Sequence, residues 1–149
     1  MRAVVQRVSD ASVTSASDVT GAIKSGLLVY LGVDRDDGEP DVKYLVEKIR
    51  YVRIFPDEAG KLNLDVAQAT GSVLVVSAFT TQADARRGRR PSFDNAAPPE
   101  KALVLYEMFC NSLASLGVKV ERGKFGHDMQ VYSINAGPVC LLMESRRAF

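Results

Sequence analysis

Near the C-terminus of this 149-residue chain, Gly137 and Pro138 interrupt two strand-like apolar runs. Proline has no backbone N–H to donate to a sheet, so within β structure it is confined to edge strands, strand entrances and special turns. We therefore predict that the segment Asn135–Cys140 forms a strand entrance or a special turn that depends on its backbone. An X-Pro bond is cis in about 5–6% of folded cases, and a trans turn between two strands is the alternative here.

The chain has the size and composition of one compact domain, residues 1–149. Hydrophobic residues make up 46% and charged residues 25% of it, which is typical of globular rather than disordered proteins. No apolar run reaches the roughly 20 residues needed to span a bilayer, and Met1–Val4 leads into strand-like sequence without a signal-peptide pattern. We therefore expect a cytoplasmic protein without membrane contact.

Apolar spacing predicts two helices. One begins at Pro40 and the other at Pro99, because proline is tolerated in the first helical turn, and Gly117 is placed to end the second. The expected buried faces are Val42, Leu45, Val46, Ile49 and Val52 in the first helix and Leu103, Tyr106, Cys110 and Leu113 in the second.

Alternating or continuous apolar runs predict the strands. These are residues 3–8, a hairpin of Ala11–Thr14 and Val19–Ile23, and then Gly26–Val33, Val73–Val76, Lys119–Arg122, Met129–Ile134 and Val139–Glu144. Because strands outnumber the two widely separated helices, we expect an α+β fold. Mixed and antiparallel sheets would form a barrel-like core with two main helices.

The residue types present do not favour several common catalytic centres. The single histidine, His127, has no evident third group to orient it in a triad, and we expect it at the surface. One histidine and two cysteines do not supply the ligand cluster of a zinc site, and no glycine pattern matches a P-loop or dinucleotide motif. We therefore expect no metal and no cofactor, with Cys110 and Cys140 as buried, unpaired packing residues.

Four arginines form a local excess of charge. The net charge is only +1, so binding to nucleic acid would have to come from a local patch. The arginines at positions 86, 87, 89 and 90 surround Gly88. They could contact several phosphates with release of counterions, with Arg86 and Arg87 as the candidate contacts. A solvated loop without a partner is the alternative.

A second notable segment, Ser77-Ala78-Phe79-Thr80, follows a predicted buried strand, whose end leaves backbone N–H groups free to form a polar pocket. Together with Asn135–Cys140, it resembles the signature of the D-aminoacyl-tRNA deacylases, which is Ser-Gln-Phe-Thr and Asn-X-Gly-Pro-Val-Thr. The resemblance runs nearly end to end, through residues 6–8, 11–13, 26–33, 53–55, 71–77, 90–93 and 128–131.

The resemblance implies a homodimeric hydrolase that removes D-amino acids, and misattached glycine, from the 3′ end of tRNA, with no DNA or membrane partner. It also implies a cis Gly137-Pro138 bond whose main-chain groups lie close to the pocket of the partner subunit and leave no room for an L side chain, a task suited to rigid backbone. Arg7 and Asn135 are the implied supporting residues. The alternatives are a plain turn for Gly137-Pro138 and a surface charge for Arg7.

The implied reaction is ester hydrolysis, whose transition state develops an oxyanion. Within the candidate catalytic segment, Ser77, Ala78, Phe79 and Thr80, the backbone around Phe79 and Thr80 supplies the candidate donors. Thr80 is interpreted as a positioning hydroxyl rather than a nucleophile, since in the family the 2′-hydroxyl of the tRNA helps to activate water. Phe125 resembles the position that lies against the terminal adenosine, and core packing is the alternative.

Two positions depart from the family pattern. Ala78 stands where the family has glutamine, and Cys140 stands where it has threonine. Alanine offers a substrate only its backbone groups, so activity survives this change if the site works through the main chain. Two hypotheses follow: an active D-aminoacyl-tRNA deacylase, or a weakened member that binds aminoacyl-tRNA ends without efficient hydrolysis.

Overall fold

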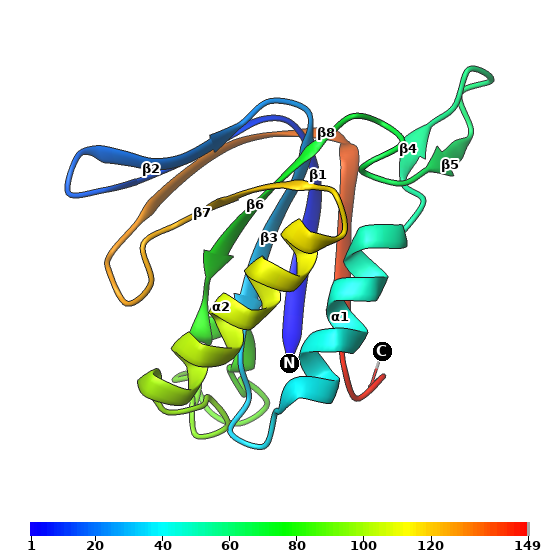
Figure 1. The fold of residues 1–149 in the computed structure, drawn as a ribbon. Coiled ribbons are helices and arrows are strands. Elements are labelled where there is room, and N and C mark those ends of the chain that lie inside the picture. Colours follow the sequence, from blue (N-terminus) through cyan, green and yellow to red (C-terminus); the bar gives the residue numbers. More distant parts are fainter. Residues whose placement is uncertain (149) are drawn as a thin grey trace.

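The computed structural model describes residues 1–148 and confirms the predicted α+β fold with two main helices on a barrel-like sheet. The elements are β1 (Arg2–Ser15), β2 (Asp18–Ile23), β3 (Gly26–Gly32), α1 (Glu39–Tyr51), β4 (Phe55–Pro56), β5 (Leu62–Leu64), β6 (Ser72–Ser77), the 3₁₀ turn η1 (Phe79–Gln82), α2 (Pro99–Ser115), β7 (Lys119–Arg122) and β8 (Gln130–Glu144). Both helices cover one face of the sheet (Figure 1). Neither helix in this part of the chain is long and apolar enough to cross a membrane.

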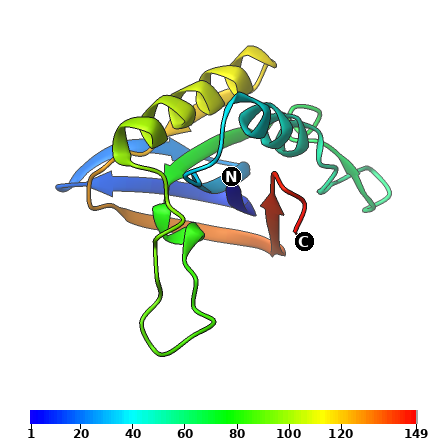
Figure 2. The same ribbon diagram turned by 90° about the horizontal axis from the view of Figure 1, so that it is seen from below.

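The long strand β1 organises the main sheet. It pairs antiparallel with β2, β3 and β8, and the sheet continues from β3 to β6 to β7 through parallel pairs. Parallel neighbours need crossover connections, and α1 and α2 lie in the two crossovers. The β1–β2 hairpin curls back until β2 contacts β6 and β7, which gives the curved section seen in Figure 2.

The core fills both faces of this sheet. The larger cluster lies under the helices and includes Val29, Leu45, Val75 and Phe109. The smaller cluster is enclosed by the curled hairpin around Val8, Val13, Leu28 and Leu74. Strands β3 and β6 thus contribute to both clusters, which explains why they read as continuous apolar runs rather than alternating ones.

Both helices begin where proline predicts a helix start. The buried face predicted for the second helix is wrong at one residue. In α1, Val42, Leu45, Val46 and Ile49 are buried as predicted. In α2, Leu103 is 37% exposed, and the buried face consists of Leu105, Tyr106, Phe109, Cys110 and Leu113. Residues 102–106 are all apolar, so spacing alone could not fix the rotation of this helix.

The largest difference from the sequence prediction concerns β8. Met129–Ile134 and Val139–Glu144 were expected as two strands, but they belong to one strand, Gln130–Glu144, that runs through the Gly137-Pro138 step. The strand keeps its pairing with β1 by shifting register between Gln6 and Val8 and again between Val8 and Asp10. The trans turn is therefore wrong: the Gly137-Pro138 bond is cis, and the segment lies at an irregularity within a continuous strand.

Candidate functional site

The end of β6 exposes two backbone donors. The N–H of Ala78 donates to the carbonyl of Leu31 at 2.8 Å, which completes the ladder with β3, and the chain then turns into η1. The next two N–H groups, of Phe79 and Thr80, have no intrahelical partner because they begin the turn. Among residues 1–148 no other acceptor bonds to them. Both residues are exposed, and their two unpaired donors are adjacent in the chain.

The Gly137-Pro138 segment is held from two sides. The side-chain amide of Asn135 accepts a hydrogen bond from the Val139 N–H at 2.8 Å and donates one to the Val139 carbonyl at 3.3 Å. The Arg7 guanidinium donates through Nε to the Ala136 carbonyl at 2.9 Å and through Nη1 to the Ile54 carbonyl at 2.6 Å. Arg7 is therefore not a free surface charge, and Gly137 and Pro138 are exposed beside it.

Within one chain these two parts of the site do not meet. Ser77 pairs with Leu31, Leu31 with Ala3, and Ala3 with Met143, so β6 is three strand spacings from β8. That is roughly 14 Å across the sheet. Gly137 lies near Arg7, four residues along β1 from Ala3, which adds roughly 13 Å along the strand.

The arginine cluster lies on a closed loop. The N–H and carbonyl groups of Asp84 and Ser92 exchange two hydrogen bonds, of 2.8 and 2.9 Å, and the loop projects away from the body in Figure 2. The Arg86 guanidinium bonds both carboxylate oxygens of Asp84, at 2.9 and 2.6 Å, and this contact holds the pKa of Asp84 well below its usual range. Arg86 is therefore already paired, and it lines an open depression of about 480 Å³ together with Asp84, Arg87 and Arg90.

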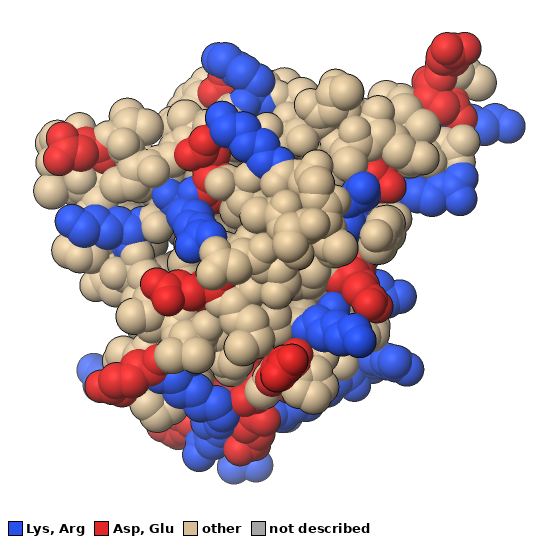
Figure 3. Space-filling view, in the orientation of Figure 1, with Lys and Arg blue, Asp and Glu red and all other residues tan. Residues whose placement is uncertain are grey.

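Both signs of charge are present on one face of the molecule. Basic and acidic side chains are intermixed over the face shown in Figure 3, in agreement with the net charge of +1.

The Phe125 side chain is half-buried and packs on the core. Its ring centroid lies 5.5 Å from that of Tyr106, whose hydroxyl donates to the Val75 carbonyl at 2.8 Å. The Gly123 N–H donates to the same carbonyl at 2.9 Å. Core packing therefore accounts for one side of this ring. The contacts at the Val75 carbonyl place the ring close to the end of β6, two residues before Ser77.

The structure adds one aromatic residue to the site and corrects one cysteine. Phe93 stacks edge-on against Phe79, with 5.1 Å between ring centroids; no sequence signal pairs these residues, because the whole arginine loop separates them. Cys140, expected to be buried, is exposed. Its β8 neighbours Val139 and Leu141 pack on the core, so alternation along the strand turns Cys140 outward.

The remaining expectations agree with the geometry or stay predictions. Cys110 is buried and unpaired, and His127 is exposed, as expected. The described residues contain no group of three or more His, Cys, Asp or Glu side chains placed to hold a metal ion. That no metal or cofactor takes part in the chemistry stays a prediction.

Comparison with known proteins gives a consistent result. Residues 4–144 match the family model described as D-Tyr-tRNA(Tyr) deacylase. The chain is 56% identical to the D-aminoacyl-tRNA deacylase of Anaeromyxobacter dehalogenans and 53% identical to that of Thermotoga petrophila, and covers 100% of each, as each covers 100% of it.

Two solved structures are similar to this chain in fold. The solved structure titled c-Myc DNA Unwinding Element Binding Protein has a TM-score of 0.91 at 38% identity, over 97% of this chain and 98% of that one; the DNA in that title belongs to that protein. A probable eukaryotic D-amino acid tRNA deacylase has a TM-score of 0.83 at 15% identity, over 96% and 98%, and shows the fold alone.

These matches show that the protein is an enzyme, a hydrolase of the deacylase type. More particularly, the chain belongs to the D-Tyr-tRNA(Tyr) deacylase family, because the family model covers most of its length and full-length relatives are more than half identical. The resemblance stated from the sequence motifs is thereby confirmed.

Proposed function

We propose that this protein hydrolyses the ester bond of D-aminoacyl-tRNA, releasing tRNA and the D-amino acid, and acts on glycyl-tRNA as well. The observation that carries the proposal is the pair of free N–H groups of Phe79 and Thr80 at the exposed end of β6. Such donors stabilise the oxyanion that forms when water attacks an ester carbonyl, by about 3–4 kcal/mol each. Membership of a deacylase family supports this assignment.

The substrate itself helps to activate the attacking water in this proposal. Ser77, Ala78, Phe79 and Thr80 offer only hydroxyls and backbone groups, and none of these is a good proton acceptor near neutral pH. The terminal 2′-hydroxyl of the tRNA lies next to the scissile ester, where it accepts a hydrogen bond from the attacking water and passes its own proton to the departing 3′ oxygen, so that no separate base is needed. The Thr80 hydroxyl orients the reactants and is not the nucleophile.

Selection for D-amino acids is assigned to Gly137 and Pro138 of a second copy of the chain. The sheet register keeps the two parts of the site well apart within one chain, so a second copy has to bring them together. Asn135 and Arg7 hold the backbone of the segment through three hydrogen bonds, and a fourth ties Arg7 to the Ile54 carbonyl. A rigid main-chain wall of this kind excludes an L side chain by steric contact and admits glycine.

Strand β8 provides a surface for that second copy. Tyr132, Ile134 and Leu142 are 57%, 48% and 62% exposed on it, which is more apolar exposure than one strand of a monomer ordinarily shows. A C₂ homodimer that covers this strand would bury these side chains. It would also cover the exposed Gly137-Pro138 segment, as the composite site requires.

Binding of the tRNA is assigned to the arginine loop and Phe125. Arg87 and Arg90 flank the open depression, which Ser92 and Asp94 also line. Phe93 stands between those two residues in the sequence and contacts Phe79, so the loop that would bind phosphates reaches the end of β6. The exposed part of Phe125 can stack on the terminal adenosine. A cytoplasmic location, where aminoacyl-tRNA is found, is part of this proposal.

A weakened member of the family is the second candidate. Ala78 favours it, because the family glutamine would bring a side-chain amide to the end of β6 and alanine does not. In that case the chain binds aminoacyl-tRNA ends but releases the amino acid slowly.

Deacylation assays separate the two candidates. The purified protein is incubated with D-Tyr-tRNA, Gly-tRNA and L-Tyr-tRNA, and release of the amino acid is followed over time. We expect release from the first two and far slower release from the third. No release from D-Tyr-tRNA or Gly-tRNA at high enzyme concentration would contradict the proposal, and recovery in the Ala78→Gln variant would then identify the missing amide as the cause.

A further inference from the structure

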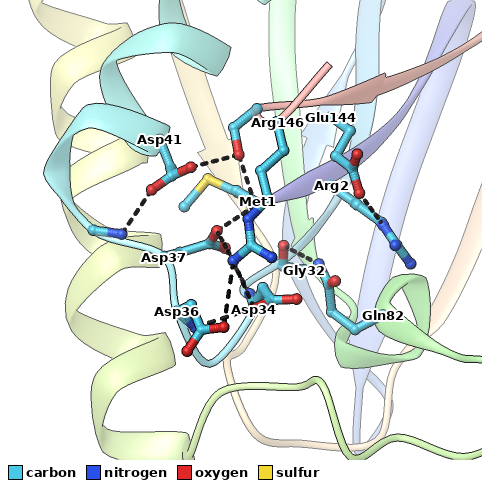
Figure 4. A network of polar contacts seen from close by, with 12 residues as sticks. Met1, Arg2, Gly32, Asp34, Asp36, Asp37, Asp41, Gln82, Glu144 and Arg146 are labelled. Atoms are coloured by element: carbon cyan, nitrogen blue, oxygen red, sulfur yellow. Dashed lines mark hydrogen bonds and ion pairs between the residues drawn. The ribbon is translucent and has the colours of Figure 1, made fainter. Parts of the chain in front are cut away.

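The turn that carries the two free N–H groups is anchored by a buried glutamine. Gln82, the last residue of η1, is 1% exposed and is the only buried Asn or Gln among residues 1–148. Its Nε2 donates to the carbonyl of Gly32 at 2.8 Å, as Figure 4 shows. Its Oε1 is buried without a hydrogen-bond partner.

Close packing between the turn and β3 depends on Gly32. A methyl group at Gly32 would overlap the hydroxyl of Thr81 and would lie 2.6 Å from the Ala78 carbonyl. Glycine therefore lets η1 lie directly against the end of β3. The Gly32 carbonyl also accepts the hydrogen bond from Gln82. The contact therefore joins the backbone of β3 to a single side chain of the turn.

A second side chain anchors the same turn from β1. The Arg2 guanidinium donates through Nη1 to the Thr81 carbonyl at 3.3 Å, and its Nε donates to Glu144 at 2.7 Å. The turn is thus fixed at Thr81 and Gln82, immediately after the residues whose N–H groups are free. Figure 4 shows Arg2, Gln82 and Gly32 together at this end of the sheet.

We propose that Gln82 is a positioning residue that fixes the backbone N–H groups of Phe79 and Thr80 for ester hydrolysis; this inference rests on the proposed function. Packing alone does not call for a glutamine here, because its Oε1 is buried without a partner, which is unfavourable, while its Nε2 bonds the Gly32 carbonyl. The amide instead gives the turn a defined orientation, which packing by an apolar side chain does not.

The test compares Gln82→Met with wild type. Misplacing reacting groups by about 1 Å costs on the order of 100-fold in rate, so we expect kcat on D-Tyr-tRNA to fall roughly 10- to 100-fold with little change in KM. Amide hydrogen exchange at Thr81 and Ala83, whose N–H groups donate within the turn to the carbonyls of Ala78 and Thr80, should become faster when measured by NMR. The matched control is Gln68→Met in the loop before β6. It removes another hydrogen bond between a glutamine side chain and the backbone, which Gln68 Oε1 accepts from the Asp65 N–H, and should leave kcat unchanged.

The outcomes separate this inference from the proposed function. A wild-type protein that releases no amino acid refutes the proposed function, and the exchange rates still test the anchoring of the turn. An active wild type with unchanged kcat and unchanged amide exchange in Gln82→Met refutes the role of Gln82. Should Gln82→Met fail to fold, Arg2→Ala releases the other anchor from a partly exposed position and is expected to lower kcat in the same direction; unchanged kcat there would overturn the anchoring model.

Discussion

The α-amino group of Met1 lies 2.5 Å from Oδ1 of Asp37, and neither group has any exposed surface. Figure 4 shows this ion pair within a network that joins the start of β1, the turn before α1 and the chain after β8. Met1 also donates to Ser145 at 2.9 Å, and Arg146 pairs with Asp34 at 2.9 Å. Burial raises the pKa of Asp37, although hydrogen bonds from the ammonium and from the Asp34 N–H oppose the shift.

The buried pair predicts a large effect of Asp37→Ala on stability. Removing one partner of a buried ion pair leaves the other charge uncompensated, which costs about 3–5 kcal/mol. We therefore expect the free energy of unfolding, measured in urea, to fall by that amount. Asp36→Ala is the control, because the Asp36 side chain is 72% exposed and lies 3.9 Å from Arg146; it should cost less than about 1 kcal/mol. Equal losses in the two variants would contradict the importance of burial.

Gly137→Ala is expected to abolish most deacylation of D-Tyr-tRNA. Gly137 has φ of +136°, a conformation that alanine rarely adopts, and an added methyl would lie 2.9 Å from Nη2 of Arg7. The segment would have to move, and we expect a rate loss on the order of 100-fold. The control is Gly60→Ala in the β4–β5 hairpin, which also has positive φ, at +76°, but has open space around it. Full activity in Gly137→Ala would exclude this segment from the site.

The arginines of the loop are expected to differ in their contribution to tRNA binding. Arg87→Ala with Arg90→Ala should weaken tRNA binding and reduce the slope of log Kd against log salt by roughly 1 to 2 units, because each lost phosphate contact removes about one released counterion. Arg86→Ala should change the slope less, since Asp84 already neutralises Arg86. Filter-binding titrations at several salt concentrations measure both. An unchanged slope in the double variant would contradict tRNA binding by the loop and favour a solvated loop without a partner.

The two cysteines should differ sharply in reactivity. Burial raises the pKa of the Cys110 thiol to about 11, so at pH 8 it is protonated as well as inaccessible, and a thiol needs its ionised form to react. We expect a disulfide reagent at pH 8 to leave Cys110 unlabelled in the folded protein and to reach it only in denaturant, and to label Cys140 only as far as the proposed dimer leaves strand β8 accessible. The Cys140→Ser variant should show no rapid labelling. Fast reaction of two thiols in the folded protein would contradict the burial of Cys110.

The sequence predicted those parts of the fold that local signals determine. Pro40 and Pro99 marked both helix starts, and continuous apolar runs marked β3 and β6. The short strands β4 and β5 were missed, because two- and three-residue strands carry no periodicity. The rotation of α2 and the outward direction of Cys140 were wrong for one reason: both depend on which neighbour each face meets, and that is set by tertiary packing.

The candidate site was predictable only in its motif residues. Ser77–Thr80 and Asn135–Cys140 stood out because of the resemblance to a family, and the structure added how Arg7 and Asn135 hold the second segment. Gln82, by contrast, is a polar residue in a polar stretch, and nothing in its sequence neighbourhood indicates burial. Its partner Gly32 is fifty residues away, so only the folded chain brings them together.

The separation of Ser77 from Gly137 along the sheet has a genetic consequence. If each working site combines the β6 end of one subunit with the Gly137-Pro138 segment of another, a chain damaged in one half can be rescued by a chain damaged only in the other. Random pairing of two such inactive proteins would leave about a quarter of all sites intact. Two alleles that each fail alone would then restore activity together.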